Sequence, residues 1–262
     1  MFVPPSIKRI FQFNSFWAGL MTAVALVLLF VAGGREIHTL TQALDHRIQD
    51  SMFRIRGPVE TSGRVVIVDI DEKSLKALGQ WPWPRDVFAD VLRNIHAAEP
   101  KVVGLDIVFA ERDRTSPVNY LPVFKDFIAG NLDDVRRSLK DNDAVLGEVM
   151  GSTGTVVGYF FQIKDDGIEP GVSIPFPAWS LSIDAIAPEL RTGLDDVLRA
   201  YRAVMNVPEV GGMSLTEGFF NSDPDSSGTV RRVPLMIIFN NTLFPSLTFE
   251  MLREGLGVER PV

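Results

Sequence analysis

The chain has 262 residues, no cysteine and a formal net charge of −7. The lack of cysteine excludes disulfides, thiol nucleophiles and cysteine-based zinc sites. All acidic residues follow Gly34, and no basic patch alternates with aromatic side chains. This charge pattern argues against nucleic-acid binding, which uses clustered positive charge to contact phosphates. The length and the 46% hydrophobic content allow one or two domains with a buried core.

An uncharged apolar segment lies close to the N-terminus. Its central sequence, from Phe16 to Ala32, is FWAGLMTAVALVLLFVA, and about 20 apolar residues span a bilayer as a helix. We therefore predict a cytoplasmic tail over 1–13 and a transmembrane helix over 14–34. A cleaved signal peptide is the alternative, but the apolar stretch is long for one. The basic residues on the two sides are balanced and do not decide the orientation.

The region after the apolar segment has the spacing of a helix. Apolar residues recur every three or four positions from Ile37 to Ile55, which predicts a stalk helix over 36–55. The pair Gly57-Pro58 then ends this helix. The apolar stripe of the stalk could contact a second copy of the chain or the chain's own domain.

Two apolar runs with helices between them follow in order. The sequences VVIVDI over 65–70 and KVVGLDIVF over 101–109 are typical of strands buried on both faces of a parallel sheet. Between them we predict a helix over 72–78 and a second helix, with Asp86 as its N-cap, that continues to Ala98. This order of strand, helix and strand predicts a right-handed parallel crossover.

The second half of the chain mixes helices and strands. The periodicity predicts helices over 132–150, 194–205 and 246–255, a strand over 155–162, and an antiparallel hairpin of strands over 214–220 and 229–239. A turn is expected at Asn240-Asn241. The expected fold class is α/β, with an N-terminal transmembrane helix followed by a three-layer α/β domain. We expect that domain to have a mostly parallel central sheet and a C-terminal antiparallel hairpin.

The sequence WPWPR over 81–85 contains two of the four tryptophans of the chain. Proline fixes φ and lacks an amide donor, so this segment belongs neither in a helix interior nor in a central strand. If Trp81 and Trp83 are exposed, they could stack on a ligand. If they are buried, they form a structural plug over the end of the sheet. We favour the plug, because large aromatic side chains lie in cores more often than in sites.

Three aspartates lie in or directly after the two predicted strands. Asp69 and Asp71 are at the end of the first and Asp106 is within the second, and ligands gather beyond the carboxyl ends of parallel strands. These carboxylates could hold a hard cation or pair with Arg85. We favour a structural alternative, in which Asp71 caps a helix and Asp69 and Asp106 pair with Arg85 or with backbone groups. No catalytic residue, metal ligand or cofactor is assigned, and the candidate ligand-binding residues are Asp69, Asp71, Trp81, Trp83, Arg85 and Asp106.

Four segments occur in a distinctive order along the chain. They are LDHRIQDSMFRIRGP, VVIVDIDEKSLKALGQWPWPRDVFADVLRNI, KVVGLDIVFAERDRTSP and DPDSSGTVRRVPL. Together they resemble the second class of CHASE sensor domain, which comprises extracytoplasmic sensory domains of bacterial receptors linked to cyclases and histidine kinases. The resemblance covers the chain from about residue 36 to its C-terminus.

The resemblance implies that residues 35–262 form a sensor domain on the periplasmic or extracellular side of the bacterial inner membrane, with the N-terminus in the cytoplasm. It implies an unidentified small-molecule or envelope signal and a homodimer, because cyclase and kinase outputs usually work as dimers. The expected output is an adenylate or guanylate cyclase that lies beyond this chain. A sensor histidine kinase is the alternative output.

The chain departs from the family pattern at two points. Ser226 and Ser227 are inserted before Gly228 in the late motif, and no further membrane helices or output domain precede the end at Val262. A stand-alone, membrane-anchored periplasmic binding protein is therefore the alternative from a different functional class.

An enzyme is the least favoured interpretation. A buried strand followed by Asp-x-Asp also resembles the nucleophile motif of the haloacid-dehalogenase phosphatases, in which the first Asp attacks phosphate and Mg²⁺ screens the charge. Those motifs continue to Thr or Val at the position where this chain has Lys73, and the chain lacks a later Gly-Asp-x-x-x-Asp stretch.

The sequence DPDSSG from Asp223 resembles the start of an EF-hand loop. An EF-hand needs a bidentate Glu at its twelfth position, and Pro234 stands there instead. A hairpin turn is the better interpretation, because Asp and Ser favour turns through local hydrogen bonds. The three histidines are scattered and show no metal-ligand spacing.

Overall fold

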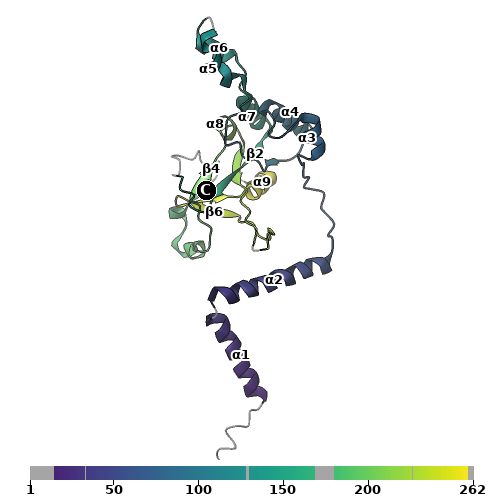
Figure 1. The fold of residues 1–262 in the computed structure, drawn as a ribbon, viewed down its shortest axis with the longest axis vertical. Helices are drawn as coiled ribbons and strands as arrows, with labels where there is room; N and C mark the ends of the chain where they lie inside the picture. Colours follow the sequence, from purple (N-terminus) through teal and green to yellow (C-terminus); the bar gives the residue numbers. More distant parts are fainter. Residues whose placement is uncertain (1–14, 33, 128–129, 169–179, 226, 259–262) are drawn as a thin grey trace, which may run out of the picture. The chain divides into compact units, whose positions relative to one another are not determined.

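The computed structural model describes residues 15–32, 34–127, 130–168, 180–225 and 227–258. The chain divides into two compact units, and Figure 1 labels their α-helices and several of the strands. The first unit contains the residues up to Val68 together with the loop Asp225–Thr229. The second unit contains Asp69–Pro224 and the remainder of the C-terminal region.

Two helices, α1 (Ser15–Ala32) and α2 (Gly34–Arg56), provide the regular structure of the first unit. α2 confirms the stalk helix predicted over 36–55. Within the described part of the chain, however, no helix is both long and apolar enough to cross a bilayer. The transmembrane helix predicted over 14–34 is therefore wrong.

The apolar segment over 65–70 forms no strand, so the prediction of a buried strand there is wrong in this structure. Ile67 is 89% exposed. Only Ile70, at the end of the segment, packs against the core of the second unit. A strand needs a neighbour that completes its backbone hydrogen bonds, and among the described strands none pairs with this segment.

The second unit is built on a four-stranded sheet with β2 (Thr155–Gln162) at its centre. β2 pairs in parallel with β1 (Val103–Leu105) and β5 (Thr216–Phe219). The last residues of β2 pair antiparallel with β4 (Arg202–Val204). The predicted strand over 155–162 is thus confirmed. The helix predicted over 194–205 is wrong, because residues 202–204 of that segment form β4, which pairs with the end of β2.

A smaller antiparallel sheet has the order β3 (Leu181–Ser182), β7 (Thr242–Pro245) and β6 (Met236–Phe239). The hairpin predicted between 214–220 and 229–239 is therefore wrong, because β5 and β6 belong to different sheets. The hairpin joins β6 to β7 instead. Asn240 and Asn241 form its turn with φ values of 46° and 59°, a backbone conformation that asparagine tolerates well.

The helices of the second unit are short and mostly capped by the residues that precede them. The one helix predicted over 132–150 is two, because Asp141 caps a new helix by accepting a hydrogen bond from the amide of Asp143. Ser246 caps the last helix as predicted. The α-helices are α3 (Glu72–Leu78), α4 (Arg85–His96), α5 (Leu121–Phe124), α6 (Leu132–Ser138), α7 (Asn142–Thr153), α8 (Pro208–Gly211) and α9 (Leu247–Leu256). The 3₁₀ turns are Pro117–Tyr120, Lys125–Phe127, Ile183–Ala185 and Pro188–Leu194.

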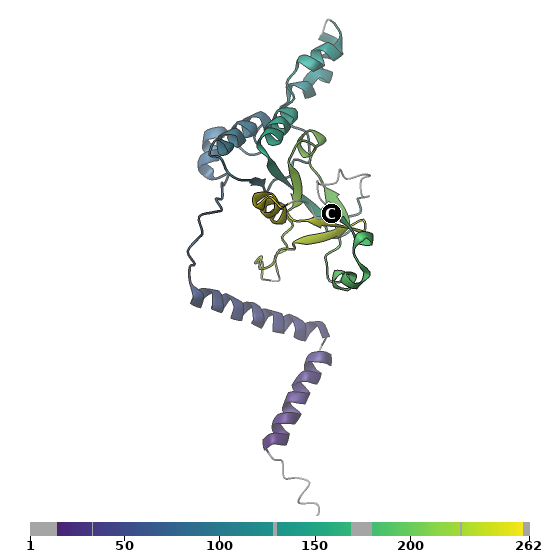
Figure 2. The ribbon, with the colours of Figure 1, turned by 180° about the vertical axis from the view of Figure 1, so that it is seen from behind.

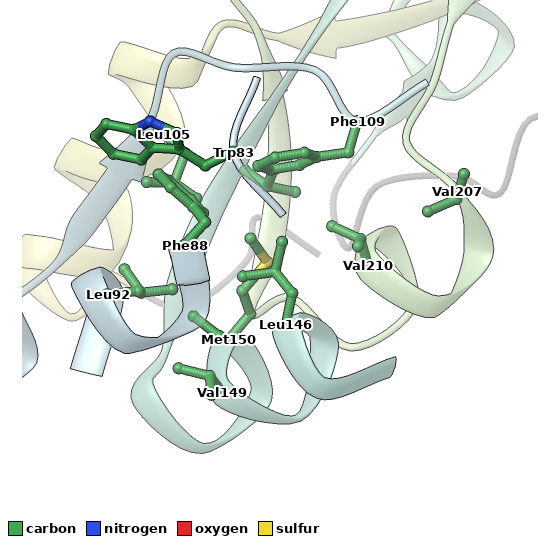
Figure 3. Packing of buried hydrophobic residues seen from close by; sticks show 12 residues of the cluster. Trp83, Phe88, Leu92, Leu105, Phe109, Leu146, Val149, Met150, Val207 and Val210 are labelled. Carbon is green, nitrogen blue, oxygen red and sulfur yellow. The ribbon is translucent and has the colours of Figure 1, made fainter. Parts of the chain in front are cut away.

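Helices cover both faces of the central sheet. On one face, α4, α7 and α8 pack over Leu105 and Val157 to form the apolar core drawn in Figure 3. On the other face lies α9, the yellow helix of Figure 2. A Cβ atom added to Gly218 of β5 would stand 2.5 Å from the Cα of Leu247, so only glycine permits this approach. A second core of mainly aromatic side chains joins the two sheets, and its buried members are Tyr159, Phe161, Phe219, Ile237, Phe239 and Phe244.

Candidate functional site

The WPWPR segment enters the core through its second tryptophan. Trp83 is 4% exposed, and its indole Nε1 donates a hydrogen bond of 2.7 Å to the carbonyl of Gly79. In Figure 3 its ring lies beside Leu105 and close to Phe88 and Phe109. The half-buried Trp81 makes edge contacts with Trp83 and Phe88, at ring-centre distances of 5.5 and 5.8 Å. The ring of Trp83 is therefore occupied by packing and offers no free face for a ligand.

Arg85 begins α4 and turns its side chain inward. Its guanidinium carbon lies 4.4 Å from the centre of the Phe109 ring, and its Nε lies 3.6 Å from Oδ1 of Asp143. The side chain is 12% exposed. Burial lowers the pKa of Arg85, while the charges of Asp143 and Asp113 oppose that effect. The guanidinium still stays charged, because an arginine does not lose its proton in a protein.

Asp113 accepts hydrogen bonds from three segments of the chain. Its Oδ2 accepts from the amide of Arg85 at 2.8 Å and from Nδ2 of Asn142 at 3.0 Å. Its Oδ1 accepts from both the amide and the hydroxyl of Thr115. Burial by itself would raise the pKa of Asp113, but the hydrogen bonds from Arg85, Thr115 and Asn142 together hold it below the ordinary value. Asp113 is thus an ionised group that joins the start of α4 to the start of α7.

Asp143 is the second carboxylate beside Arg85, and it is fully buried. Its Oδ2 accepts a hydrogen bond of 2.9 Å from the amide of Asp113. Burial raises the pKa of Asp143, and the hydrogen bond and the charge of Arg85 reduce that rise. Within the described residues, Oδ1 of Asp143, Oδ1 of Asn142 and Nε of Arg85 are buried and make no hydrogen bond. A buried polar atom without a hydrogen bond lowers the stability of the folded state. A small rearrangement that gives these atoms hydrogen-bond partners would therefore be favourable.

Charged pairs surround this network on the protein surface. Arg112 pairs with Glu209 of α8, and its Nη1 lies 3.8 Å from Oδ2 of Asp141. Lys140 donates a hydrogen bond of 2.8 Å to Asp86. We call Arg85, Asp113, Asn142 and Asp143 the Arg85 network. It joins α4, α7 and the loop after β1 through ionic hydrogen bonds.

The aspartates singled out from the sequence do not meet in one place. Asp71 caps α3 by accepting hydrogen bonds from the amide and hydroxyl of Ser74 at 2.8 and 2.7 Å, as the structural alternative predicted. Asp69 and Asp106 are exposed. Among the described residues no cluster of three or more His, Asp or Glu side chains could hold a metal ion. The ion-pair partner of Arg85 is Asp143 instead.

The two segments that carry the sequence motifs meet in this network, since Arg85 of WPWPR lies over Phe109 of KVVGLDIVF. A family model described as the CHASE2 domain matches residues 21–261. The chain belongs to the CHASE2 family. Its members are sensory domains of signalling proteins and not catalytic ones. Comparison with curated proteins and with solved structures found no match.

The residues of this CHASE2 domain that sequence reasoning missed are mostly the partners of Arg85. Asp113 and Asp143 lie 28 and 58 positions beyond Arg85 in the chain, in segments expected to be a polar loop and a helix interior. A weak signal existed for both. Asp113 stands two residues before Thr115, the spacing of a side-chain turn, and the sequence DND at 141–143 has the composition of a helix N-terminus.

Proposed function

We propose that this chain is the extracytoplasmic sensory input domain of a bacterial signalling protein whose output is a nucleotide cyclase. The observation that carries the proposal is the CHASE2 match over residues 21–261. A histidine kinase is the alternative output within the same function.

The Arg85 network is the part of the domain that we propose to respond to the signal. A signal can shift a conformational equilibrium only if it interacts differently with the two states. The network contains three buried polar atoms without hydrogen bonds, so a rearranged state can gain bonds that this state lacks. Because Arg85, Asp113 and Asp143 stand at the start of α4, in the loop after β1 and at the start of α7, such a rearrangement would shift both helices.

A second copy of the chain is the partner that we propose for α2. This helix exposes an apolar stripe in which Leu44, Ile48, Met52 and Ile55 are between 56% and 87% exposed. These residues recur at spacings of three and four, which places them on one face of the helix. Such a stripe is normally covered, and a symmetric pair of stalks would cover it and place two output domains side by side.

The experiment measures output in cells that produce the signalling protein carrying this domain. Cyclic nucleotide content and histidine phosphorylation are both followed for the wild type, for Arg85→Ala and for the exposed control Glu148→Gln. We expect Arg85→Ala, and not the control, to change the cyclic nucleotide content. A change in histidine phosphorylation alone would favour the kinase alternative. If Arg85→Ala leaves both outputs at the wild-type level, the Arg85 network is not part of sensing.

A further inference from the structure

A second buried acid lies outside the Arg85 network. Glu217 of β5 is 4% exposed, and its Oε1 accepts a hydrogen bond of 2.8 Å from Nδ2 of Asn206. A Cβ atom added to Gly211 of α8 would stand 2.7 Å from that oxygen, so the helix backbone packs directly on the carboxyl group. The carboxyl is therefore enclosed between the sheet and α8.

Among the described residues, no cation compensates a charge on Glu217. In the part of the chain that the structure describes, no Lys, Arg or His side chain lies within ion-pairing distance of it. The ionisable groups on the neighbouring elements are not cations that could pair with Glu217. On β2, Tyr159 is fully buried; on α8, Glu209 pairs with Arg112; across the sheet on α9, Glu250 pairs with Arg253.

This environment decides when Glu217 loses its proton. Burial raises the pKa of Glu217 from 4.5 to about 7, and the hydrogen bond from Asn206 limits the rise. A group with this pKa is about half ionised at neutral pH and about nine-tenths ionised one pH unit higher. Its protonation state therefore changes around neutral pH.

Asn206 connects Glu217 to the aromatic ring beneath Arg85. The second hydrogen of its Nδ2 is donated to the carbonyl of Gly158 at 3.0 Å, and its Oδ1 accepts from the amide of Phe109 at 2.8 Å. The amide of Val207 donates to the carbonyl of Phe109 at 2.7 Å. Both the amide and the carbonyl of Phe109 are thus hydrogen-bonded to Asn206 or Val207, and Asn206 is also the residue that contacts Glu217. An ionised acceptor forms shorter and stronger hydrogen bonds than a neutral one, so ionisation of Glu217 pulls on Asn206.

We propose that the proton is a signal that this domain senses, bound by Glu217 and transmitted through Asn206 and Phe109 to Arg85. The proposal rests on the sensory function proposed above and supplies the chemistry of one signal. The proposal needs no ligand other than the proton. The carboxyl of Glu217, the side-chain amide of Asn206 and the ring of Phe109 under Arg85 all belong to this chain.

The sign of the stability effect follows from the direction of the shift. The unfolded chain releases this proton near pH 4.5 and the folded domain near pH 7. Between these values the folded state holds more protons, so the contribution of Glu217 to stability is greatest below pH 4.5 and falls as the pH rises to about 7. The melting temperature of Glu217→Gln, which cannot ionise at this position, should fall less over that range. The matched control Glu148→Gln, at an exposed position on α7, should keep the wild-type slope.

The deciding experiment is an NMR titration of the full chain between pH 5 and 9. We expect the side-chain carboxyl carbon of Glu217 to titrate with a midpoint of about 7. The amide of Phe109 and the guanidinium of Arg85 should shift with the same midpoint in the wild type and stay constant in Glu217→Gln. The wild-type titration decides the matter even if the variant does not fold.

Two results would overturn the proposal. One is a Glu217 midpoint near its ordinary value, and the other is a Glu217 titration to which Phe109 and Arg85 do not respond. Either result would remove the proton as a signal and leave the sensory function itself standing, because the output measurement with Arg85→Ala tests that function separately.

Discussion

The backbone amide of Arg85 donates a 2.8 Å hydrogen bond to Oδ2 of Asp113, although 28 positions separate the two residues in the chain. This bond joins the WPWPR segment to the loop after β1. The same carboxylate accepts from Asn142 at the start of α7. Asp113 therefore fixes the relative positions of α4, α7 and the loop after β1.

Replacing Asp113 by alanine should destabilise the domain strongly. The change leaves the amide of Arg85 without an acceptor and leaves the side-chain amide of Asn142 with only the 3.4 Å contact to Oγ1 of Thr115. Hydrogen bonds to a charged acceptor contribute about 1.5–3 kcal/mol each, so we expect a loss of roughly 2–4 kcal/mol in the free energy of unfolding, measured by urea denaturation. Asp133→Ala, at an exposed position on α6, is the control and should change it by less than about 0.5 kcal/mol. Equal effects of the two substitutions would contradict the role given to Asp113.

The contribution of Asp113 should also depend on pH. The pKa of this carboxyl is lowered from 3.8 in the folded domain, so the folded state favours its ionised form. The stabilisation is complete above the unfolded value of 3.8 and is lost as the pH falls below it. The difference in unfolding free energy between the wild type and Asp113→Ala should therefore be constant from pH 5 to 6 and decrease below pH 4. A difference that grows on acidification would refute this assignment.

Trp83→Ala should lower stability more than any other change in the WPWPR segment. The ring is 4% exposed and its Nε1 is hydrogen-bonded to Gly79. Removal of a buried tryptophan typically costs about 3–5 kcal/mol, which would appear as a marked drop in melting temperature. Trp81→Ala, at a half-buried position, should cost less. A Trp83→Ala variant with wild-type stability and altered output would identify a ligand site in place of a structural plug.

Paired stalks can be detected by cysteine cross-linking, since the chain has no cysteine of its own. Ile48→Cys places a thiol in the apolar stripe of α2, and Ala43→Cys places one on the opposite face of the helix. Under mild oxidation we expect a disulfide-linked dimer for Ile48→Cys and mostly monomer for Ala43→Cys. Similar dimer yields at both positions would mean that the stripe is not the contact surface.

Local sequence signals predicted the elements that depend on local interactions. The stalk helix followed from its apolar spacing, β2 from its β-branched run, and the caps at Asp71 and Ser246 from their side chains. Each of these features is decided by residues within a few positions of one another, which is the range that periodicity and capping report.

The errors arose where distant residues or total length decide the outcome. The run at 65–70 has the composition of a buried strand, but a strand also needs a neighbour, and composition does not supply one. Residues 202–204 became a strand because β2 was available beside them. The apolar segment near the N-terminus has the composition of a span, yet among the described residues no helix is both long and apolar enough to cross a bilayer.

The candidate site was predictable only in part. Arg85 was identified because it closes a distinctive aromatic segment, but its partners were sought among aspartates at strand ends. Asp113 and Asp143 come from a loop and a helix start whose positions depend on how α4 and α7 pack. Glu217 had no sequence signal at all, because a single Glu in a strand becomes informative only once its burial and the absence of a nearby cation are known.

The most direct test of the account is the location of the folded domain in living cells. Glu148→Cys introduces one exposed thiol on α7 into a chain that otherwise has none, and a membrane-impermeant maleimide is then added to intact cells. If the domain is the extracytoplasmic input of a signalling protein, Glu148→Cys will be labelled as fully in intact cells as after lysis, while a cytoplasmic thiol protein stays unlabelled. Labelling that appears only after lysis would contradict the account.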